Sequence, residues 1–164
     1  MSDNDKKTVL TDTILPRFCE SIMQVFETMV FMPIKCGEPT LKEDGTPTAG
    51  VSGTIGLTGE NLCGSLSLAF PTELTKQVFR SMMMMGADDE VDMKELKDAV
   101  GELANMIAGG AKVKLQDDGI DFIIGLPTVV VGESHHLEAP GNATAYVVPV
   151  QPDKGIFYME LAIA

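Results

Sequence analysis

The chain has 164 residues, with 12 Lys and Arg against 24 Asp and Glu, which gives a formal net charge of −12. The length suits one domain with a substantial core, and the negative charge opposes binding to phosphate backbones and anionic lipid headgroups, so we expect neither nucleic acid nor a membrane as a partner. The N-terminal residues MSDNDKK lack the apolar core of a signal peptide, and no apolar run approaches the roughly 20 residues that span a bilayer, which predicts a cytoplasmic protein.

The N-terminal quarter of the chain predicts one long helix. Residues 1–7 are polar and are expected to form a flexible tail. Within Thr8–Met32, apolar residues recur at helical spacing, and Pro33 then ends the helix because it has no backbone N–H to donate.

The next part of the chain predicts strands. Residues 34–41 are expected to form a short edge strand, and the turn-rich residues 42–50 a connection. Apolar and small polar residues then alternate along 51–57 and again along 62–70. This pattern predicts an antiparallel hairpin whose turn lies at residues 58–61.

A second helix is predicted from Pro71 to Met85, and it ends in four consecutive methionines. A cluster of flexible thioethers usually fills a gap in the core, although it can also line an adaptable binding surface. We expect core packing for these methionines, followed by an acidic loop at residues 86–91.

The central helix is predicted over Asp92–Leu115. Asp92 can cap its start, and Glu95 completes a capping-box pattern. At helical spacing, one face of this helix is apolar and is predicted to face the core. That face carries Leu96, Val100, Leu103, Ile107 and Ala111, with Leu115 near its margin.

The opposite face of this helix is polar but rich in glycine. It carries Asp98, Gly101, Glu102, Asn105, Gly109 and Lys112. A helical Gly costs about 1 kcal/mol relative to Ala, and it leaves bare backbone that another surface can approach closely. The alternative is that Gly109–Gly110 ends the helix and that Glu102 and Asn105 are ordinary solvated residues.

The C-terminal part predicts more strands. Residues 122–126 and 129–132 are expected to be strand, with a break or bulge at Pro127, and 133–142 a loop. A second hairpin is predicted from two further strands, 144–150 and 156–164. The whole order predicts one α+β domain over residues 1–164, in which helices pack on one face of a mostly antiparallel sheet in two layers.

The cysteines and histidines do not suggest a metal site. Cys19, Cys36 and Cys63 are widely spaced and are expected to be small buried thiols. His135 and His136 are adjacent, which suits a loop better than shared coordination. We therefore predict no metal of the protein's own.

Residues 98–109, DAVGELANMIAG, resemble the signature helix of the CheC/CheX/FliY family of bacterial chemotaxis phosphatases, in which a Glu and an Asn lie three residues apart and a Gly follows. The similarity extends to Gly53–Gly56, Leu66–Pro71 and Gly125–Pro127, which leads to Val131–Gly132. The second helix lacks a Glu followed three residues later by Asn, so the resemblance is closest to CheX-type members, which implies one site per subunit and a homodimer.

This resemblance implies a phosphatase that hydrolyses the aspartyl phosphate of a CheY-like response regulator. Asn105 would hold the attacking water, and Glu102 would dock against a Lys of the regulator. Mg²⁺ is expected on the regulator, so no cofactor of the protein's own is implied. Partner contacts are expected at Asp98, Gly101, Gly109 and Lys112, with ordinary solvation as the alternative for Asp98 and Lys112.

The alternative from a different class is a non-catalytic adaptor that binds a response regulator or serves as a flagellar switch component. Asn105 separates the two hypotheses, because an adaptor has no need of an amide at that position. We therefore favour the enzyme.

Overall fold

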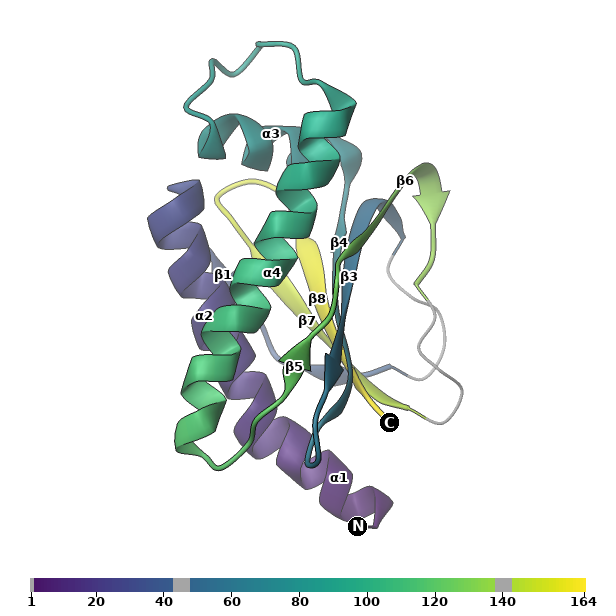
Figure 1. Ribbon diagram of the computed structural model, residues 1–164. Helices are drawn as coiled ribbons and strands as arrows, with labels where there is room; N and C mark the ends of the chain where they lie inside the picture. Colours follow the sequence, from purple (N-terminus) through teal and green to yellow (C-terminus); the bar gives the residue numbers. More distant parts are fainter. Residues whose placement is uncertain (1, 43–47, 138–142) are drawn as a thin grey trace.

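A computed structural model describes residues 2–42, 48–137 and 143–164 (Figure 1). Within them, eight antiparallel strands form one sheet in the order β1-β7-β8-β4-β3-β5, with β2 also beside β7 and β6 also beside β3. Helices α2 and α4 pack together on one face of this sheet (Figure 1), which confirms the α+β prediction. The strands are β1 (Lys35–Cys36), β2 (Thr40–Leu41), β3 (Ala49–Thr58), β4 (Cys63–Phe70), β5 (Ile123–Ile124), β6 (Thr128–His135), β7 (Thr144–Gln151) and β8 (Phe157–Ile163).

The first helical segment is longer than the sequence predicted. It runs without interruption through α1 (Asp3–Val9), η1 (Leu10–Ile14), α2 (Leu15–Val25) and η2 (Phe26–Val30). Residues 3–7 are therefore helical, and their assignment to a flexible tail is corrected. The reason is a capping box, in which Ser2 Oγ accepts a hydrogen bond from the Asp5 N–H and the Asp5 carboxylate accepts one from the Ser2 N–H.

Both predicted hairpins are confirmed. Strand β3 pairs with β4, β7 pairs with β8, and the β4–β8 pair joins the two hairpins into one sheet. The predicted edge strand at 34–41 is present as the two short strands β1 and β2. The predicted connection at 42–50 already contains the start of β3 at Ala49, and its residues 43–47 lie outside the described residues.

The predicted break at Pro127 is confirmed between β5 and β6. Both strands pair with β3, and the Gly125 N–H donates to Gly56 O at 2.9 Å across the break. The predicted loop at 133–142 is wrong at its beginning, because the pairing of β6 with β3 continues to His135. Residues 138–142 lie outside the described residues.

Helix α4 (Met93–Asp117) starts where predicted, because Asp92 Oδ1 accepts hydrogen bonds from the backbone of Lys94 and Glu95. The helix continues to Asp117, so the alternative that Gly109–Gly110 ends it is wrong. Gly110 instead lets α2 approach, since a Cβ there would collide with Ser21 Oγ, which donates to Ile107 O at 2.6 Å. All six residues predicted for the core face of α4 are buried: Leu96, Val100, Leu103, Ile107, Ala111 and Leu115.

The methionine run is only partly in the core. Helix α3 (Thr72–Met82) ends before the run does, and Met84 adopts the left-handed conformation with φ of 54°. Met82 and Met85 pack against the core, whereas Met83 is 50% and Met84 79% exposed. The core prediction is therefore wrong for Met83 and Met84, because the helix ends and carries them into solvent.

Two further sequence predictions concern solvent exposure and membranes. Cys63 is exposed, so its assignment as a buried thiol is wrong, while Cys19 and Cys36 are half-buried against the core. Among the described residues, no helix is both long and apolar enough to cross a membrane.

Candidate functional site

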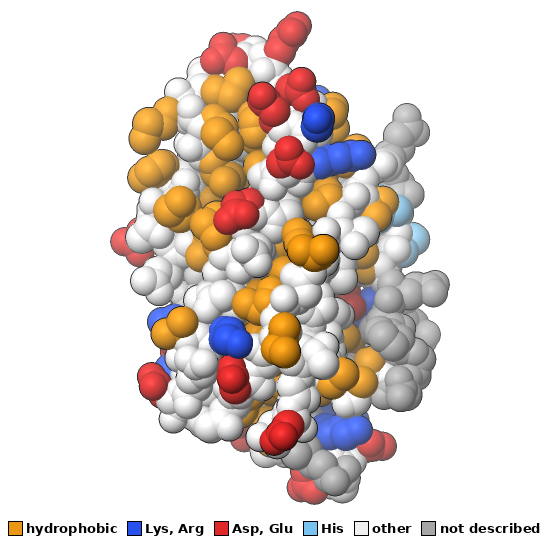
Figure 2. All heavy atoms as spheres, in the orientation of Figure 1, with side chains coloured by type: hydrophobic (Ala, Val, Ile, Leu, Met, Phe, Trp, Pro, Cys, Tyr) orange, Lys and Arg blue, Asp and Glu red, His pale blue; other side chains and the backbone are white. Residues whose placement is uncertain are grey.

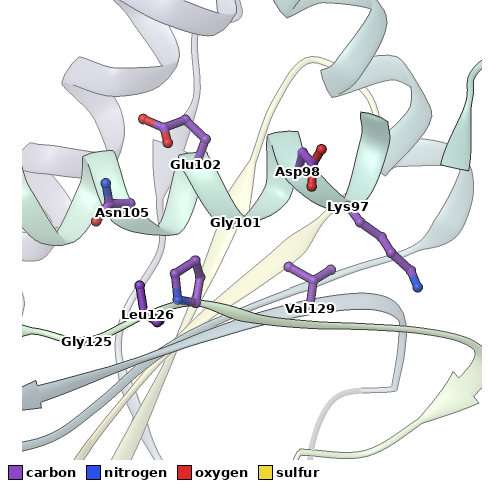
Figure 3. Close-up of a pocket in the computed structure, with 9 residues that line it drawn as sticks. Lys97, Asp98, Gly101, Glu102, Asn105, Gly125, Leu126 and Val129 are labelled. Atoms are coloured by element: carbon purple, nitrogen blue, oxygen red, sulfur yellow. The ribbon is translucent and has the colours of Figure 1, made fainter. Parts of the chain in front are cut away.

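A groove of about 410 Å³ lies between α4 and the segment that joins β5 to β6 (Figure 3). The helix contributes one wall and the segment with the start of β6 contributes the other. The lining consists of Lys97, Asp98, Gly101, Glu102, Asn105, Gly125, Leu126, Pro127 and Val129. The polar face of α4 and a second element distant in the sequence therefore meet at one place.

Small residues determine how closely α4 sits on the sheet. A Cβ at Gly53 of β3 would lie 2.9 Å from Val100 Cγ1, and a Cβ at Gly101 would lie 3.3 Å from Pro127 Cγ. Both glycines are buried. The bare backbone of Gly101 is therefore covered by the protein's own Pro127, which differs from the expectation that this glycine exposes backbone to a partner.

Glu102 and Asn105 project from the solvent side of α4, and both are exposed. In Figure 3 the Glu102 carboxylate points away from segment 125–127, and Asn105 lies on the next turn of the helix. Within the described part of the chain, neither side chain takes part in a hydrogen bond or ion pair with another residue. Both polar groups are therefore available to a partner molecule.

The side chains that line the groove belong to few chemical types. Among the described residues around the groove there is no Ser, Thr, Cys or His, so the usual nucleophile and base pairs are missing there. No three His, Cys, Asp or Glu side chains of the described residues converge in a metal-binding arrangement. What the groove does offer is an amide, carboxylates and the Lys97 ammonium, which suit orientation of a water molecule and contact with a charged substrate.

The remaining sequence-predicted residues are spread along α4. Asp98 is exposed and lines the groove. Gly109 lies one turn beyond Asn105 and outside the groove lining, and a Cβ there would meet no atom within 4 Å.

Lys112 also lies outside the groove lining, and its observed contacts are internal. Its Nζ forms an ion pair with Asp121 at 3.1 Å, donates to Phe122 O and lies 5.7 Å from the centre of the Phe122 ring. The hydrogen bond from Lys112 also lowers the pKa of the Asp121 carboxyl. Lys112 therefore anchors the chain that follows α4, and a contact with a partner stays a prediction.

Five lining residues were not among the predicted site residues, namely Lys97, Gly125, Leu126, Pro127 and Val129. Leu126 is 91% exposed, although it is a large apolar residue. A signal for it was present in the sequence, because Leu126 is the last residue of the predicted strand 122–126 and stands directly before the predicted break at Pro127, where the strand no longer continues into the core.

Comparisons with known proteins place this geometry in context. Residues 51–151 match the family model described as "Chemotaxis phosphatase CheX". A Thermotoga maritima protein named CheY-P phosphatase CheX is 32% identical over 122 residues, which cover 74% of this chain and 77% of the relative.

Solved structures are similar over most of the chain. The chemotaxis protein CheX from Vibrio vulnificus has a TM-score of 0.84 at 30% identity and covers 92% of this chain and 99% of its own. The structure of a CheX–CheY–BeF3–Mg²⁺ complex from Borrelia burgdorferi has a TM-score of 0.74 at 26% identity, with 92% and 97% covered.

Proposed function

The chain belongs to the CheX family of chemotaxis phosphatases, and from this premise we propose that it hydrolyses the aspartyl phosphate of a CheY-like response regulator. One observation carries the proposal. Glu102 and Asn105 lie one turn apart on the exposed face of α4 and line a groove, and their polar groups form no hydrogen bond or ion pair with other described residues. The relative named a CheY-P phosphatase and the solved CheX–CheY complex support the choice of substrate.

The reaction needs positioning more than a strong base. An aspartyl phosphate is a reactive acyl phosphate, and its hydrolysis transfers the phosphoryl group to a water molecule held in line with the leaving carboxylate. As the new P–O bond forms, the bond between phosphorus and the aspartate oxygen breaks, so the regulator's aspartate leaves as a carboxylate, and the proton lost by the water passes to the inorganic phosphate product or to solvent. A protein that orders this water can therefore accelerate the reaction without a nucleophile of its own.

Asn105 is assigned the water-positioning role. An amide is not a useful base, but its carbonyl oxygen accepts a hydrogen bond from water and fixes the direction of attack. Glu102 is assigned the docking role, because a carboxylate one turn away can pair with a Lys of the regulator in a charge-assisted hydrogen bond. Asp98 and Gly109 are assigned to the contact surface on the same face of α4.

Mg²⁺ belongs to the regulator in this proposal. The complex from Borrelia burgdorferi contains Mg²⁺ together with CheY, which supports that placement. The ion would neutralise charge on the phosphoryl oxygens. This chain then contributes Asn105 and Glu102 and holds no cofactor of its own. Because its substrate is a response regulator, the protein is proposed to act in the cytoplasm.

The test is single-turnover decay of a purified phosphorylated regulator from the same organism. Asn105→Ala should slow the catalysed decay by about 100-fold or more, as expected for a lost positioning group, and should leave binding to the BeF3-loaded regulator nearly unchanged. Glu102→Ala should weaken both binding and turnover. Asn61→Ala serves as a matched control, because Asn61 is exposed and lies outside the groove lining.

The outcome also decides between the two classes of function. If Asn105→Ala keeps the full rate, the water-positioning assignment is wrong. If the wild-type protein binds the regulator without accelerating its decay, the adaptor or switch-component alternative replaces the enzyme.

A further inference from the structure

A second hollow, of about 480 Å³, lies on the other flank of α4 from the groove. Its floor is apolar and comes mostly from the end of α3, and its rim is acidic and comes from α4. The lining consists of Phe79, Met82, Met83, Glu95, Asp98, Ala99 and Glu102. We call it the methionine hollow. Asp98 and Glu102 line both it and the groove, so the two depressions share one acidic ridge.

The floor of the methionine hollow exposes apolar surface, and the residues beneath it are held in place by packing and a hydrogen bond. Phe79 is buried, and Ser81 Oγ donates to Val30 O at 2.5 Å, which holds the end of α3 against η2. Met83, by contrast, is 50% exposed. In Figure 2 hydrophobic side chains gather at the upper left of the visible face, beside acidic side chains that follow the upper part of α4. A methionine adapts its shape to the side chain that contacts it.

The rim of the hollow is negatively charged. Glu95, Asp98 and Glu102 are exposed, and none forms an ion pair in the part of the chain that the structure describes. An apolar floor below a carboxylate rim complements a side chain that has an apolar stem and a cationic head. Lys and Arg have that form, because their methylene stems cover apolar surface while the charged group stays at the edge.

We propose that the methionine hollow receives a Lys or Arg side chain of the phosphorylated response regulator and helps to decide which regulator is accepted. The inference rests on the proposed function, since the regulator is the partner that reaches Glu102. A regulator whose active site covers Glu102 and Asn105 must also cover the flanks of the same helix. The acidic rim complements a cationic side chain, and the hollow is continuous with the groove through Asp98 and Glu102. Both observations favour a Lys or Arg of the regulator as the occupant.

The first arm of the test changes the floor. The rate of decay is measured against regulator concentration for Met83→Ser and for the matched control Met84→Ser, since Met84 is 79% exposed but does not line the hollow. Met83→Ser should raise KM by about 10-fold with kcat unchanged, whereas the control should match the wild type. Thermal melting of both variants checks that each is folded.

The second arm changes the rim. Glu95→Lys should weaken binding of the BeF3-loaded regulator by about 10-fold or more, because it places a like charge against the incoming cation. Glu60→Lys gives the same change in net charge at an exposed position outside the hollow, and it should bind like the wild type. A regulator in which the contacting Lys or Arg is replaced by Glu should recover binding to the Glu95→Lys variant.

The two proposals fail in different ways. If the wild-type protein shows no acceleration, the phosphatase proposal fails, and the binding arm still tests the hollow. If the wild type is active while Met83→Ser and Glu95→Lys behave like their controls, the hollow does not receive the regulator.

Discussion

Pro127 packs directly against the backbone of Gly101, so that a Cβ at residue 101 would lie 3.3 Å from Pro127 Cγ. This contact sets the distance between α4 and the segment that carries Leu126, and hence the width of the groove. Gly109, two turns further along α4, has no atom within 4 Å of the position of a Cβ. The two glycines of α4 therefore differ in their surroundings: Gly101 is in contact with Pro127, whereas Gly109 has open space where a side chain would be.

The two glycines predict opposite effects of alanine. Gly109→Ala should raise the free energy of unfolding by about 0.5–1 kcal/mol, because Ala is the better helix former and meets no neighbour. Gly101→Ala should raise the free energy of unfolding by less than Gly109→Ala does, or should lower it, because Pro127 must shift by a few tenths of an ångström. Denaturant unfolding of both variants measures the difference, and equal effects would contradict the packing argument.

The same pair also tests the proposed contact at Gly109. If the regulator approaches the backbone there, Gly109→Ala should bind the BeF3-loaded regulator more weakly although the protein is more stable. An unchanged affinity would remove Gly109 from the contact surface.

Leu126 is predicted to be an apolar contact for the regulator beside Asn105. It is 91% exposed, and the hydrogen bond of Gly125 and the packing of Pro127 hold the residues on either side of it. Leu126→Ser should leave the free energy of unfolding within about 0.5 kcal/mol of the wild type and weaken regulator binding. Ile123→Ser is the control, because Ile123 is 73% exposed but lies outside the groove. Equal binding by the two variants would refute the contact.

A buried ion pair joins Lys42 to the sheet. Lys42 Nζ lies 2.9 Å from both carboxylate oxygens of Glu160, and the two side chains are only 10% and 7% exposed. Lys42→Met should cost about 3–5 kcal/mol of folding free energy, because it leaves the Glu160 carboxylate buried without its partner. The double variant Lys42→Met, Glu160→Leu should lose less folding free energy than Lys42→Met alone, because it leaves no buried charge. Chemical denaturation of Lys42→Met, Glu160→Leu and the double variant provides the measurement, and additive effects of the two single changes would argue against this explanation.

The Arg17–Asp118 pair predicts a pH dependence of stability. Arg17 donates from Nε and Nη2 to the two carboxylate oxygens of Asp118 at 2.8 and 3.2 Å, which ties α2 to the end of α4. These bonds lower the pKa of Asp118 below its ordinary value. The folded state therefore gains stability from this group above the unfolded-state pKa of about 4 and loses that gain as the pH falls through the lower folded-state pKa.

Asp118→Asn should accordingly lower Tm at pH 7, and its difference from the wild type should shrink as the pH falls below about 4. Thermal melting across this pH range measures it. A difference that stays constant down to pH 2 would show that the charge of Asp118 is not responsible.

Homodimerisation stays a prediction. The resemblance to CheX-type members with a single Glu–Asn site implies it, and β6 adds a physical reason. Strand β6 pairs with β3 along one edge, no described strand covers its other edge, and Val130 and Val131 are partly exposed there. Light scattering at micromolar concentration should give about twice the 17.6 kDa chain mass. A monomer over a wide concentration range would contradict the prediction.

The elements that sequence alone predicted well are those whose signals are local. The cap at Asp92, the apolar spacing of Leu96 to Leu115 and the alternation in both hairpins each arise within one stretch of chain. Glu102 and Asn105 lie one turn apart on the exposed face for the same reason, since both belong to one helix. The family resemblance then attached a chemistry to that pair, which spacing by itself could not do.

The sequence was least informative where two distant elements meet. Segments elsewhere in the chain decide the surroundings of three residues on or near α4. Gly101 faces Pro127 and not a partner, Lys112 is bound to Asp121 and not only to solvent, and Met83 lines a hollow and is not buried. Helical period identifies the faces of one helix, but it carries no information about what packs on each face. The exposed pair on α4 was therefore determined by the sequence, and the groove and hollow beside it only by tertiary packing.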